Sequence, residues 1–238
     1  MTSSAADRVA IVTGATGALG RLVTGDLAGA GMRVGIVGSR MDRLEALAAD
    51  LALPADRWLG HAANLSDPEG AQAAVDAVIA RFGRVDILIH LVGGWAGGAT
   101  VADLAPGDIA TMLDQHLWTT FNVTRALVPH LVAGGWGRVI AISTPVAVTP
   151  TAKMAPYAIG KAAQEALLLT LAREVAGTGV TVNLLQVRKI DTEHARERDP
   201  SPSHASWTAP EEIVAAIRYL CTDEAGIVNG ARIPLHGG

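Results

Sequence analysis

The chain has 238 residues, half of them hydrophobic, and a formal net charge of −4. This charge provides no basic surface for nucleic acid or an anionic membrane, and no apolar run reaches the roughly 18 residues of a membrane helix. The length suits one domain over residues 1–238, and a lone Cys221 with no targeting segment indicates a cytoplasmic protein.

The first 40 residues predict a strand, a glycine turn, a helix and a second strand. Residues 9–12 are an apolar run, 13–20 are rich in glycine, and an apolar helical face follows until Gly31. Residues 33–37 read as a second buried strand. A turn of this kind directs backbone N–H groups toward a diphosphate. Two strands joined through a helix in this way predict a parallel sheet.

The same alternation of strands and helices continues to the end of the chain. Further strands are expected at 58–62, 85–91, 138–142, 180–186 and 232–235, and further helices at 42–51, 68–82, 106–131, around 157–175, and at 210–220. The sequence therefore predicts an α/β fold with a doubly wound, parallel, seven-stranded sheet and helices on both faces.

Tyr157 and Lys161 lie four residues apart on a predicted helix, so both side chains share one face. An ammonium beside a phenol favours the phenolate and tunes it for acid–base work. Lysine is rare here, with three lysines against sixteen arginines, and a compact cation suits this role. The alternative is that this spacing arises by chance, and the glycine turn upstream is evidence against that alternative.

With the glycine turn, this pair and the strand order in register, the chain resembles the short-chain dehydrogenase/reductase family over nearly its whole length. Thr13, Gly14 and Gly20 match the family turn Thr-Gly-x-x-x-Gly-x-Gly, and Ala18 replaces its middle glycine. The resemblance implies a Rossmann-like fold and hydride transfer between a nicotinamide cofactor and a carbonyl or alcohol substrate.

The resemblance also implies which residues bind the cofactor. Gly38-Ser39-Arg40 replaces the family's acidic residue on the adenosine ribose, which favours NADP(H) over NAD(H), since an arginine suits a 2′-phosphate. The alternative is that Arg40 only begins the next helix in solvent. The implied cofactor-binding residues are Gly14, Thr16, Gly17, Leu19, Ser39, Arg40, Asn64, Leu65, Val92, Gly93, Tyr157, Lys161 and Arg188.

At the reaction end, the resemblance assigns catalysis to Tyr157, Lys161, Thr144 and His116. Tyr157 would protonate the substrate oxygen, while Lys161 would hold the cofactor ribose and lower the Tyr157 pKa. Thr144 takes the place of the catalytic serine, with Ser143 as the alternative. His116 replaces the family's active-site asparagine in the proton relay, and an imidazole there predicts a pH dependence near pH ~6.5. The alternative is a buried, neutral histidine.

Two further replacements lie near the nicotinamide position. His90-Leu91-Val92-Gly93 stands for the family's Asn-Asn-Ala-Gly, and Val187-Arg188 stands for its Pro-Gly. With Lys189, Arg188 would favour an anionic substrate. Alternatively, Arg188 turns outward to pair with Asp191 or Glu193.

Residues 188–209 are rich in charge, proline and serine and lack apolar periodicity, which is typical of the family's substrate loop or lid. An ordinary surface loop is the alternative. The histidines show no metal-ligand spacing with each other or with Cys221, so no metal is expected.

The sequence thus predicts an NADP(H)-dependent oxidoreductase acting on a small carbonyl substrate. The rival is a relative that has lost hydride transfer and serves non-redox proton transfer or ligand binding. We also expect a homo-oligomer, a dimer or tetramer, through helices 106–131 and 157–175. Leu113, Leu117, Leu168 and Leu171 are the candidate contacts, unless they face the sheet.

Overall fold

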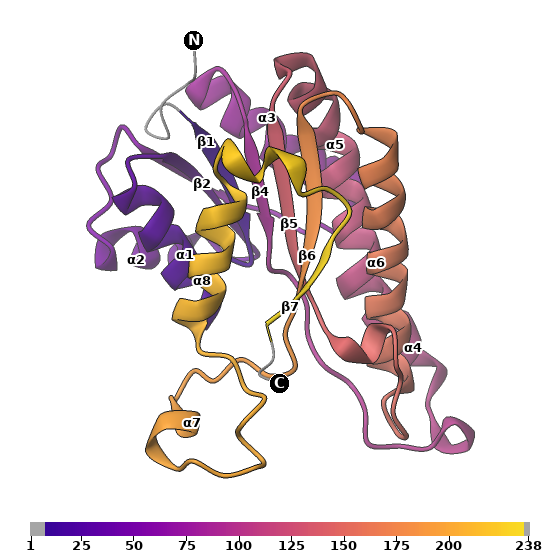
Figure 1. Ribbon diagram of the computed structural model, residues 1–238. Coiled ribbons are helices and arrows are strands. Elements are labelled where there is room, and N and C mark those ends of the chain that lie inside the picture. Colours follow the sequence, from indigo (N-terminus) through magenta and orange to yellow (C-terminus); the bar gives the residue numbers. More distant parts are fainter. Residues whose placement is uncertain (1–7, 236–238) are drawn as a thin grey trace.

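The computed structural model describes residues 8–235 and forms one seven-stranded sheet covered by helices on both faces (Figure 1). All neighbouring strands are parallel, in the order β3-β2-β1-β4-β5-β6-β7. The predicted Rossmann-like, doubly wound fold is therefore confirmed.

The strands and helices follow the alternation read from the sequence. The strands are β1 (Val9–Thr13), β2 (Arg33–Gly38), β3 (Trp58–Ala62), β4 (Ile87–His90), β5 (Gly137–Ser143), β6 (Val180–Gln186) and β7 (Arg232–Pro234). The helices are α1 (Ala18–Gly29), α2 (Met41–Asp50), α3 (Pro68–Phe82), α4 (Pro106–Leu113), α5 (Thr119–Gly134), α6 (Ala155–Glu174), α7 (Ala195–Arg198) and α8 (Pro210–Leu220).

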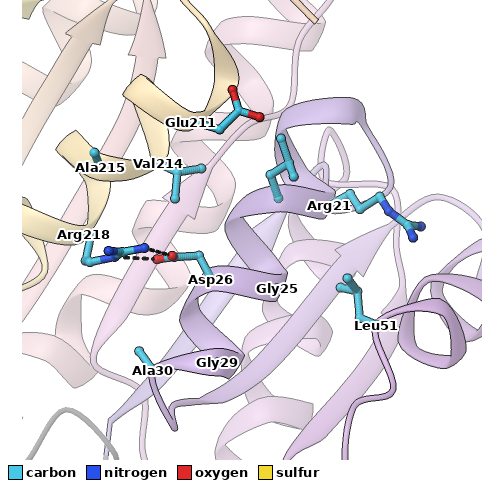
Figure 2. A pocket seen from close by; sticks show the side chains of 11 residues that line it. Arg21, Gly25, Asp26, Gly29, Ala30, Leu51, Glu211, Val214, Ala215 and Arg218 are labelled. Atoms are coloured by element: carbon cyan, nitrogen blue, oxygen red, sulfur yellow. Dashed lines mark hydrogen bonds and ion pairs between the residues drawn. The ribbon is translucent and has the colours of Figure 1, made fainter.

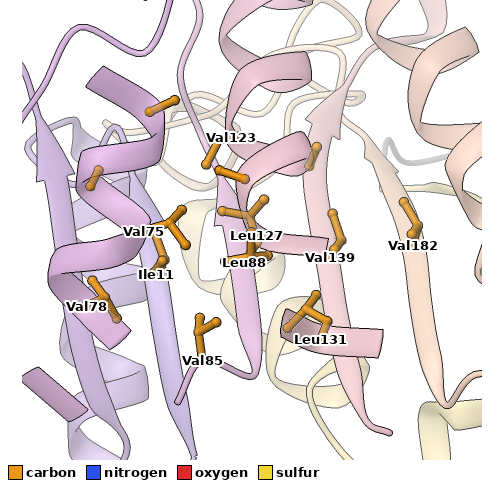
Figure 3. Close-up of a cluster of buried hydrophobic side chains, with 14 of the residues drawn as sticks. Ile11, Val75, Val78, Val85, Leu88, Val123, Leu127, Leu131, Val139 and Val182 are labelled. Atoms are coloured by element: carbon orange, nitrogen blue, oxygen red, sulfur yellow. The ribbon is translucent and has the colours of Figure 1, made fainter. Parts of the chain in front are cut away.

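Each face of the sheet has its own core because side chains alternate along each strand. Ile11 of β1 joins the core under α3, α5 and α6, where Leu127 and Leu131 are fully buried (Figure 3). Its neighbour Val12 joins the core under α1, α2 and α8. The fold thus leaves the carboxyl ends of the strands open at one edge of the sheet, which is where ligands bind in such folds.

The predicted helix 106–131 is interrupted. α4 ends at Leu113, a π-helical turn spans Asp114–Trp118, and α5 continues to Gly134. A π turn inserts an extra residue into the helix and is often found at functional sites. Here it changes the direction of Gln115 and His116, which a regular helix would place differently.

Leu168 is 1% exposed and belongs to the core between α6 and the sheet. Its proposed role in an oligomer contact is therefore wrong, and the alternative that it faces the sheet holds. Leu171 also packs against this core, whereas Leu113 and Leu117 are only half-buried. None of the helices within 8–235 combines the length and apolar character needed to cross a membrane.

Candidate active site

Two adjoining hollows lie at the carboxyl edge of the sheet, around the switch point between β1 and β4. One, of about 670 Å³, extends over Ser39, Asn64 and Leu65, and we call it the adenosine hollow. The other, of about 280 Å³, contains Tyr157 and Lys161, and we call it the reaction cavity. Both share the lining residues Gly14, Gly17, Leu91, Val92, Gly93 and Gly94, so they form one groove.

The glycine turn after β1 has the shape that a diphosphate needs. Gly14 adopts φ +66°, and a Cβ there would lie 2.9 Å from the Leu91 carbonyl. A Cβ at Gly20 would lie 2.4 Å from the Gly14 carbonyl oxygen. Gly17 is the N-cap residue of α1 and provides no side-chain cap, so the first N–H groups of this helix are available to an anion. The turn therefore fits the diphosphate of a dinucleotide.

Most of the predicted cofactor residues line this groove. The adenosine hollow contains Thr16, Ser39, Asn64, Leu65, Val92 and Gly93, and the reaction cavity contains Leu19, Val92, Gly93, Tyr157 and Lys161. Ala18, the residue in place of the middle glycine, is exposed at the start of α1 and also lines the reaction cavity.

Arg40 is the N-cap residue of α2 and does not line either hollow within the described chain. Its guanidinium is paired with Asp42 through Nε at 3.0 Å and through a second nitrogen, and its side chain is more than half exposed. Asp42 is the first cause of the raised pKa of Arg40. A 2′-phosphate would therefore have to compete with this carboxylate.

Tyr157 is half-buried at the start of α6, and its hydroxyl is hydrogen-bonded to the Thr144 side chain. Burial raises the pKa of Tyr157, and the bond to Thr144 partly opposes this rise. The predicted lowering of this pKa by Lys161 is not present in the structure: burial sets the direction of the shift, and Lys161 does not contribute to it. Thr144 follows β5 and is 1% exposed.

Lys161 is buried, and its ammonium donates hydrogen bonds to the Ile142 carbonyl oxygen at 2.7 Å and to Gln164 Oε1 at 3.0 Å. Burial lowers the pKa of Lys161 to about 7, while Glu165 acts to raise it. Gln164 Nε2 donates to Thr120 Oγ1 at 2.9 Å. An ammonium has three donors, so one remains for a ligand in the cavity.

A buried carboxylate behind the site was missed in the sequence. Glu165 accepts hydrogen bonds from Ser143 Oγ at 2.5 Å and from Gln186 Nε2 at 3.2 Å, and it pairs with Arg232. These contacts connect α6 to the ends of β5 and β6 and to the start of β7. Since Ser143 is committed to this carboxylate, Thr144 is the hydroxyl that faces Tyr157. The sequence signal that could have revealed it is a glutamate, Glu165, at a position surrounded by apolar residues of the predicted helix.

His116 lies on the π turn and is 1% exposed. Its Nε2–H donates to the Gly94 carbonyl oxygen at 3.0 Å, and its ring meets the Tyr157 ring edge to face at 5.6 Å. Burial lowers its pKa to about 3, with the Lys161 charge as the second cause. The predicted titration of His116 near neutrality is therefore wrong, and the alternative of a buried neutral imidazole holds.

His90 ends β4 and is also buried and neutral, with its pKa lowered to about 3 by burial first and by the Lys161 and His116 charges. Its Nδ1 is 2.8 Å from Thr13 Oγ1, and its Nε2 is 3.4 Å from Thr119 Oγ1. Thr119 donates its own proton to the Gln115 carbonyl oxygen, so Nε2–H of His90 is the donor to Thr119. The imidazole thus connects β1 to the start of α5.

The segment 188–209 is closed at its base. Ile190 and Thr208 form a short parallel bridge, and the Asp191 carboxylate caps α7 through the N–H groups of Ala195 and Arg196, both at 2.8 Å. The segment therefore contains a short helix that the sequence did not predict. It projects beyond the carboxyl edge of the sheet, near the C-terminal end of the described chain (Figure 1).

Arg188 is exposed and lies outside the described lining of the reaction cavity. Neither partner named for it is available, because Asp191 caps α7 and Glu193 pairs with Arg198 at 3.6 Å. Lys189 instead lies 3.4 Å above the Trp207 ring. The residues of this segment that do enter the cavity are Ile190 and Thr192, which sequence reasoning missed.

A larger hollow of about 860 Å³ lies away from the strand ends, between α1 and α8 (Figure 2). Its charged groups already have partners: Arg218 pairs with Asp26, Arg21 with Asp50 at 2.8 Å, and Glu211 with His194 at 3.1 Å. It therefore offers no free acid, base or nucleophile. Within residues 8–235 no cluster of three or more His, Cys, Asp or Glu side chains could hold a metal.

Residues 8–202 match the short chain dehydrogenase family. The chain is 30% identical to D-threitol dehydrogenase of Mycolicibacterium smegmatis, with 97% of this chain and 92% of the relative covered. It is 28% identical to the 3-oxoacyl-acyl-carrier-protein reductase FabG of Vibrio cholerae, covering 97% and 96%. A crystal structure of a short chain dehydrogenase from Bacillus anthracis superposes with a TM-score of 0.88 at 25% identity, covering 99% and 97%.

Proposed function

The chain belongs to the short-chain dehydrogenase family and is an NAD(P)-dependent oxidoreductase; within that class, we propose that it interconverts a small carbonyl compound and its alcohol with NADP(H). The observation that carries this proposal is the arrangement of Tyr157, Thr144 and Lys161. The tyrosine hydroxyl, bonded to Thr144, and the buried ammonium share one end of the groove whose other half fits a dinucleotide.

When bound, NADP(H) supplies or accepts the hydride. Tyr157 gives its hydroxyl proton to the substrate oxygen during reduction and takes it back during oxidation. Thr144 orients the same oxygen through its hydroxyl. Lys161, whose other two N–H groups bond to Ile142 and Gln164, would hold the ribose through its remaining N–H, while Gly14, Gly17 and the start of α1 would hold the diphosphate.

The preference for NADP(H) rests on Ser39 and Arg40. Ser39 lines the adenosine hollow, and the carboxylate in the described lining of that hollow, Asp114, accepts a hydrogen bond from Ser66 Oγ at 2.8 Å. Arg40 is the nearest guanidinium in sequence, and its partner Asp42 is exposed, so a 2′-phosphate can displace that carboxylate.

The substrates named for the two relatives differ, threitol in one and a 3-oxoacyl group on a carrier protein in the other. What they share is the exchange between an alcohol and a carbonyl. The predicted anionic group on the substrate depends on Arg188. Because Arg188 lies outside the described lining of the reaction cavity, the proposal does not include an anionic substrate.

We further propose that the segment 188–209 covers the substrate, since Ile190 and Thr192 already form part of the cavity wall. For the homo-oligomer, Trp118 on the π turn and Ile159 on α6 are 49% and 40% exposed and replace Leu168 as candidate contacts. Light scattering at micromolar concentration would detect the dimer or tetramer.

Titration of the purified protein with NADPH and NADH, followed by a screen of small ketones for cofactor oxidation, tests the proposal. We expect tight binding of NADPH and turnover of at least one ketone. Tight binding with no turnover of any ketone or alcohol would instead support the rival, a relative that serves non-redox proton transfer or ligand binding. The trio of Tyr157, Lys161 and Thr144 argues against a protein that only binds a ligand, since binding alone does not need these three groups.

A further inference from the structure

Three consecutive residues at the carboxyl end of β5 each bond to a different side chain of α6. The pairs are Ile142 with Lys161, Ser143 with Glu165, and Thr144 with Tyr157. The three helix residues follow one another at intervals of four positions, so they share one face of α6. The end of the strand is thus attached to the helix at three adjacent points, and two of these points are catalytic side chains.

Glu165 forms the third point, and both of its carboxylate oxygens bond to strands of the sheet. Its side chain is 2% exposed. Oε1 accepts from Ser143 Oγ at 2.5 Å and from Gln186 Nε2 at 3.2 Å, and Oε2 pairs with Arg232. Because Ser143 directly precedes Thr144, the bond to the carboxylate also fixes the place of the Thr144 hydroxyl.

Glu165 also acts on Lys161 through its charge. The other titratable side chains in the described lining of the reaction cavity are Tyr157, His90 and His116. Burial raises the pKa of Tyr157 and lowers the pKa values of both histidines to about 3, so these three groups are uncharged at neutral pH. Glu165, about one helical turn from Lys161, is therefore the negative charge that opposes the loss of the lysine proton.

The pair of Glu165 and Arg232 is poorly explained by stability alone. Removing a carboxylate from water costs about as much free energy as its pairing returns, so apolar residues of similar volume often stabilise a protein equally well. The Arg232 side chain is 43% exposed, which weakens the attraction further. The effect of the carboxylate on Ser143 and Lys161 explains its presence better.

We propose that Glu165 is a positioning residue of the active site, which holds the end of β5 against α6 so that the Thr144 hydroxyl meets Tyr157, and whose charge keeps Lys161 as an ammonium. The inference rests on the proposed function, because it assigns a role in the same reaction. Glu165 lies outside the described lining of the reaction cavity, so it acts through these residues and exchanges no proton with the substrate.

Two substitutions of matched shape test the role of the charge. Glu165→Gln keeps an oxygen for Ser143 and removes the negative charge, whereas Arg232→Gln keeps an N–H at the place of Nε and removes the positive charge. Fluorescence titration from about pH 5.5 to 9 measures the pH at which NADPH affinity falls. We expect this midpoint to move to lower pH in Glu165→Gln and to higher pH in Arg232→Gln, by at least about half a pH unit each. Titration of the cofactor's own phosphate is common to all variants and cancels.

Ser143→Ala tests the role in positioning. It removes the bond between β5 and the carboxylate and keeps both charges, so the NADPH midpoint should stay at the wild-type value. The kcat for ketone reduction should fall at least about tenfold, since small displacements of a catalytic group cost factors of this size. Butan-2-one, cyclohexanone and ethyl acetoacetate are the ketones measured. Glu174→Gln, the same change as Glu165→Gln at an exposed position at the end of α6, is the control and should match the wild type in both measurements.

Circular dichroism shows whether each variant is folded, and Arg232→Gln and Ser143→Ala decide the question if Glu165→Gln is not. Wild-type midpoints in the folded charge variants, shifts of both in the same direction, or a flat profile in the wild type would overturn the role of the charge. A wild-type kcat in folded Ser143→Ala would overturn the role in positioning. Either result leaves the proposed function intact. No turnover of any of the three ketones by the wild type would count against the proposed function itself, while the NADPH midpoints would still decide the role of Glu165.

Discussion

Lys161 and Gln164, about one turn apart on α6, are joined by a hydrogen bond of 3.0 Å, and both side chains are buried. The Gln164 amide in turn donates a hydrogen bond to the Thr120 hydroxyl, and that hydroxyl donates to the His116 carbonyl oxygen at 2.6 Å. The lysine is thus fixed to the same π turn that carries His116. Two of its three N–H groups are committed to the protein, so its direction is fixed by neighbours identified in the structure, while burial lowers its pKa.

The first prediction concerns the pH dependence of cofactor binding. Burial lowers the pKa of Lys161 to about 7, so the free protein loses this charge as the pH rises through that value. The ammonium attracts the anionic cofactor, so NADPH affinity should fall with rising pH above about 7, by up to about tenfold per unit. Fluorescence titration from pH 6 to 9 measures this. In Lys161→Met the dependence should disappear; a flat profile in the wild type would contradict the assignment.

The second prediction uses Gln164, whose oxygen stabilises the protonated lysine. Gln164→Leu removes an acceptor from the ammonium, which should lower the pKa of Lys161 and move the binding midpoint to lower pH. Gln164→Glu adds a negative charge at the same place and should move the midpoint to higher pH. A purely structural role would reduce stability in both variants without shifting their midpoints in opposite directions.

The third prediction concerns Tyr157. Tyr157→Phe should lower turnover by about 10²–10⁴-fold, since positioned acids contribute factors of this size, and should leave NADPH affinity nearly unchanged. Lys161→Ala should weaken both. Thr144→Ser keeps the hydroxyl that is bonded to Tyr157 and serves as the matched control. Retention of more than a few per cent of activity in Tyr157→Phe would show that another group donates the proton.

The sequence predicted those parts of the fold and site that depend on local spacing. The separation of Tyr157 and Lys161 is a property of any regular helix, and the glycine turn depends on adjacent residues. The direction of the His116 side chain depends on one extra residue in the π turn. The spacing of hydrophobic residues in the sequence does not indicate such an insertion. Likewise, the burial of Leu168 depends on how α6 is rotated against the sheet, and the pairing of Arg40 with Asp42 depends on side-chain geometry.

The fourth prediction concerns the choice between NADP(H) and NAD(H). Since Asp42 competes for Arg40, Asp42→Asn should free the guanidinium and increase NADPH affinity several-fold, with little effect on NADH. Arg40→Asp should reverse the preference. The dissociation constants of NADPH and NADH for the wild type, Asp42→Asn and Arg40→Asp measure this preference. Equal affinities in the wild type, unchanged in Asp42→Asn, would place Arg40 outside cofactor recognition.

The last prediction follows from the two buried imidazoles, His90 and His116. Burial lowers both pKa values from 6.5 to about 3, so between these limits the unfolded chain binds protons that the folded chain does not. The free energy of unfolding should therefore fall as the pH falls from about 6.5 toward 3, by up to about 1.4 kcal/mol per pH unit for each histidine. Above pH 6.5 neither group contributes a pH dependence.

Urea unfolding of the wild type at pH 7.0, 6.0 and 5.0 measures this loss, and His90→Asn removes one contribution while keeping an amide that can bond to Thr13 and Thr119. The variant should be less stable at pH 7.0 but lose less stability between pH 7.0 and 5.0 than the wild type. If His90→Asn has the wild-type slope, the imidazole is protonated in the folded protein, and the chain of bonds from Thr13 to Gln115 must have a different arrangement.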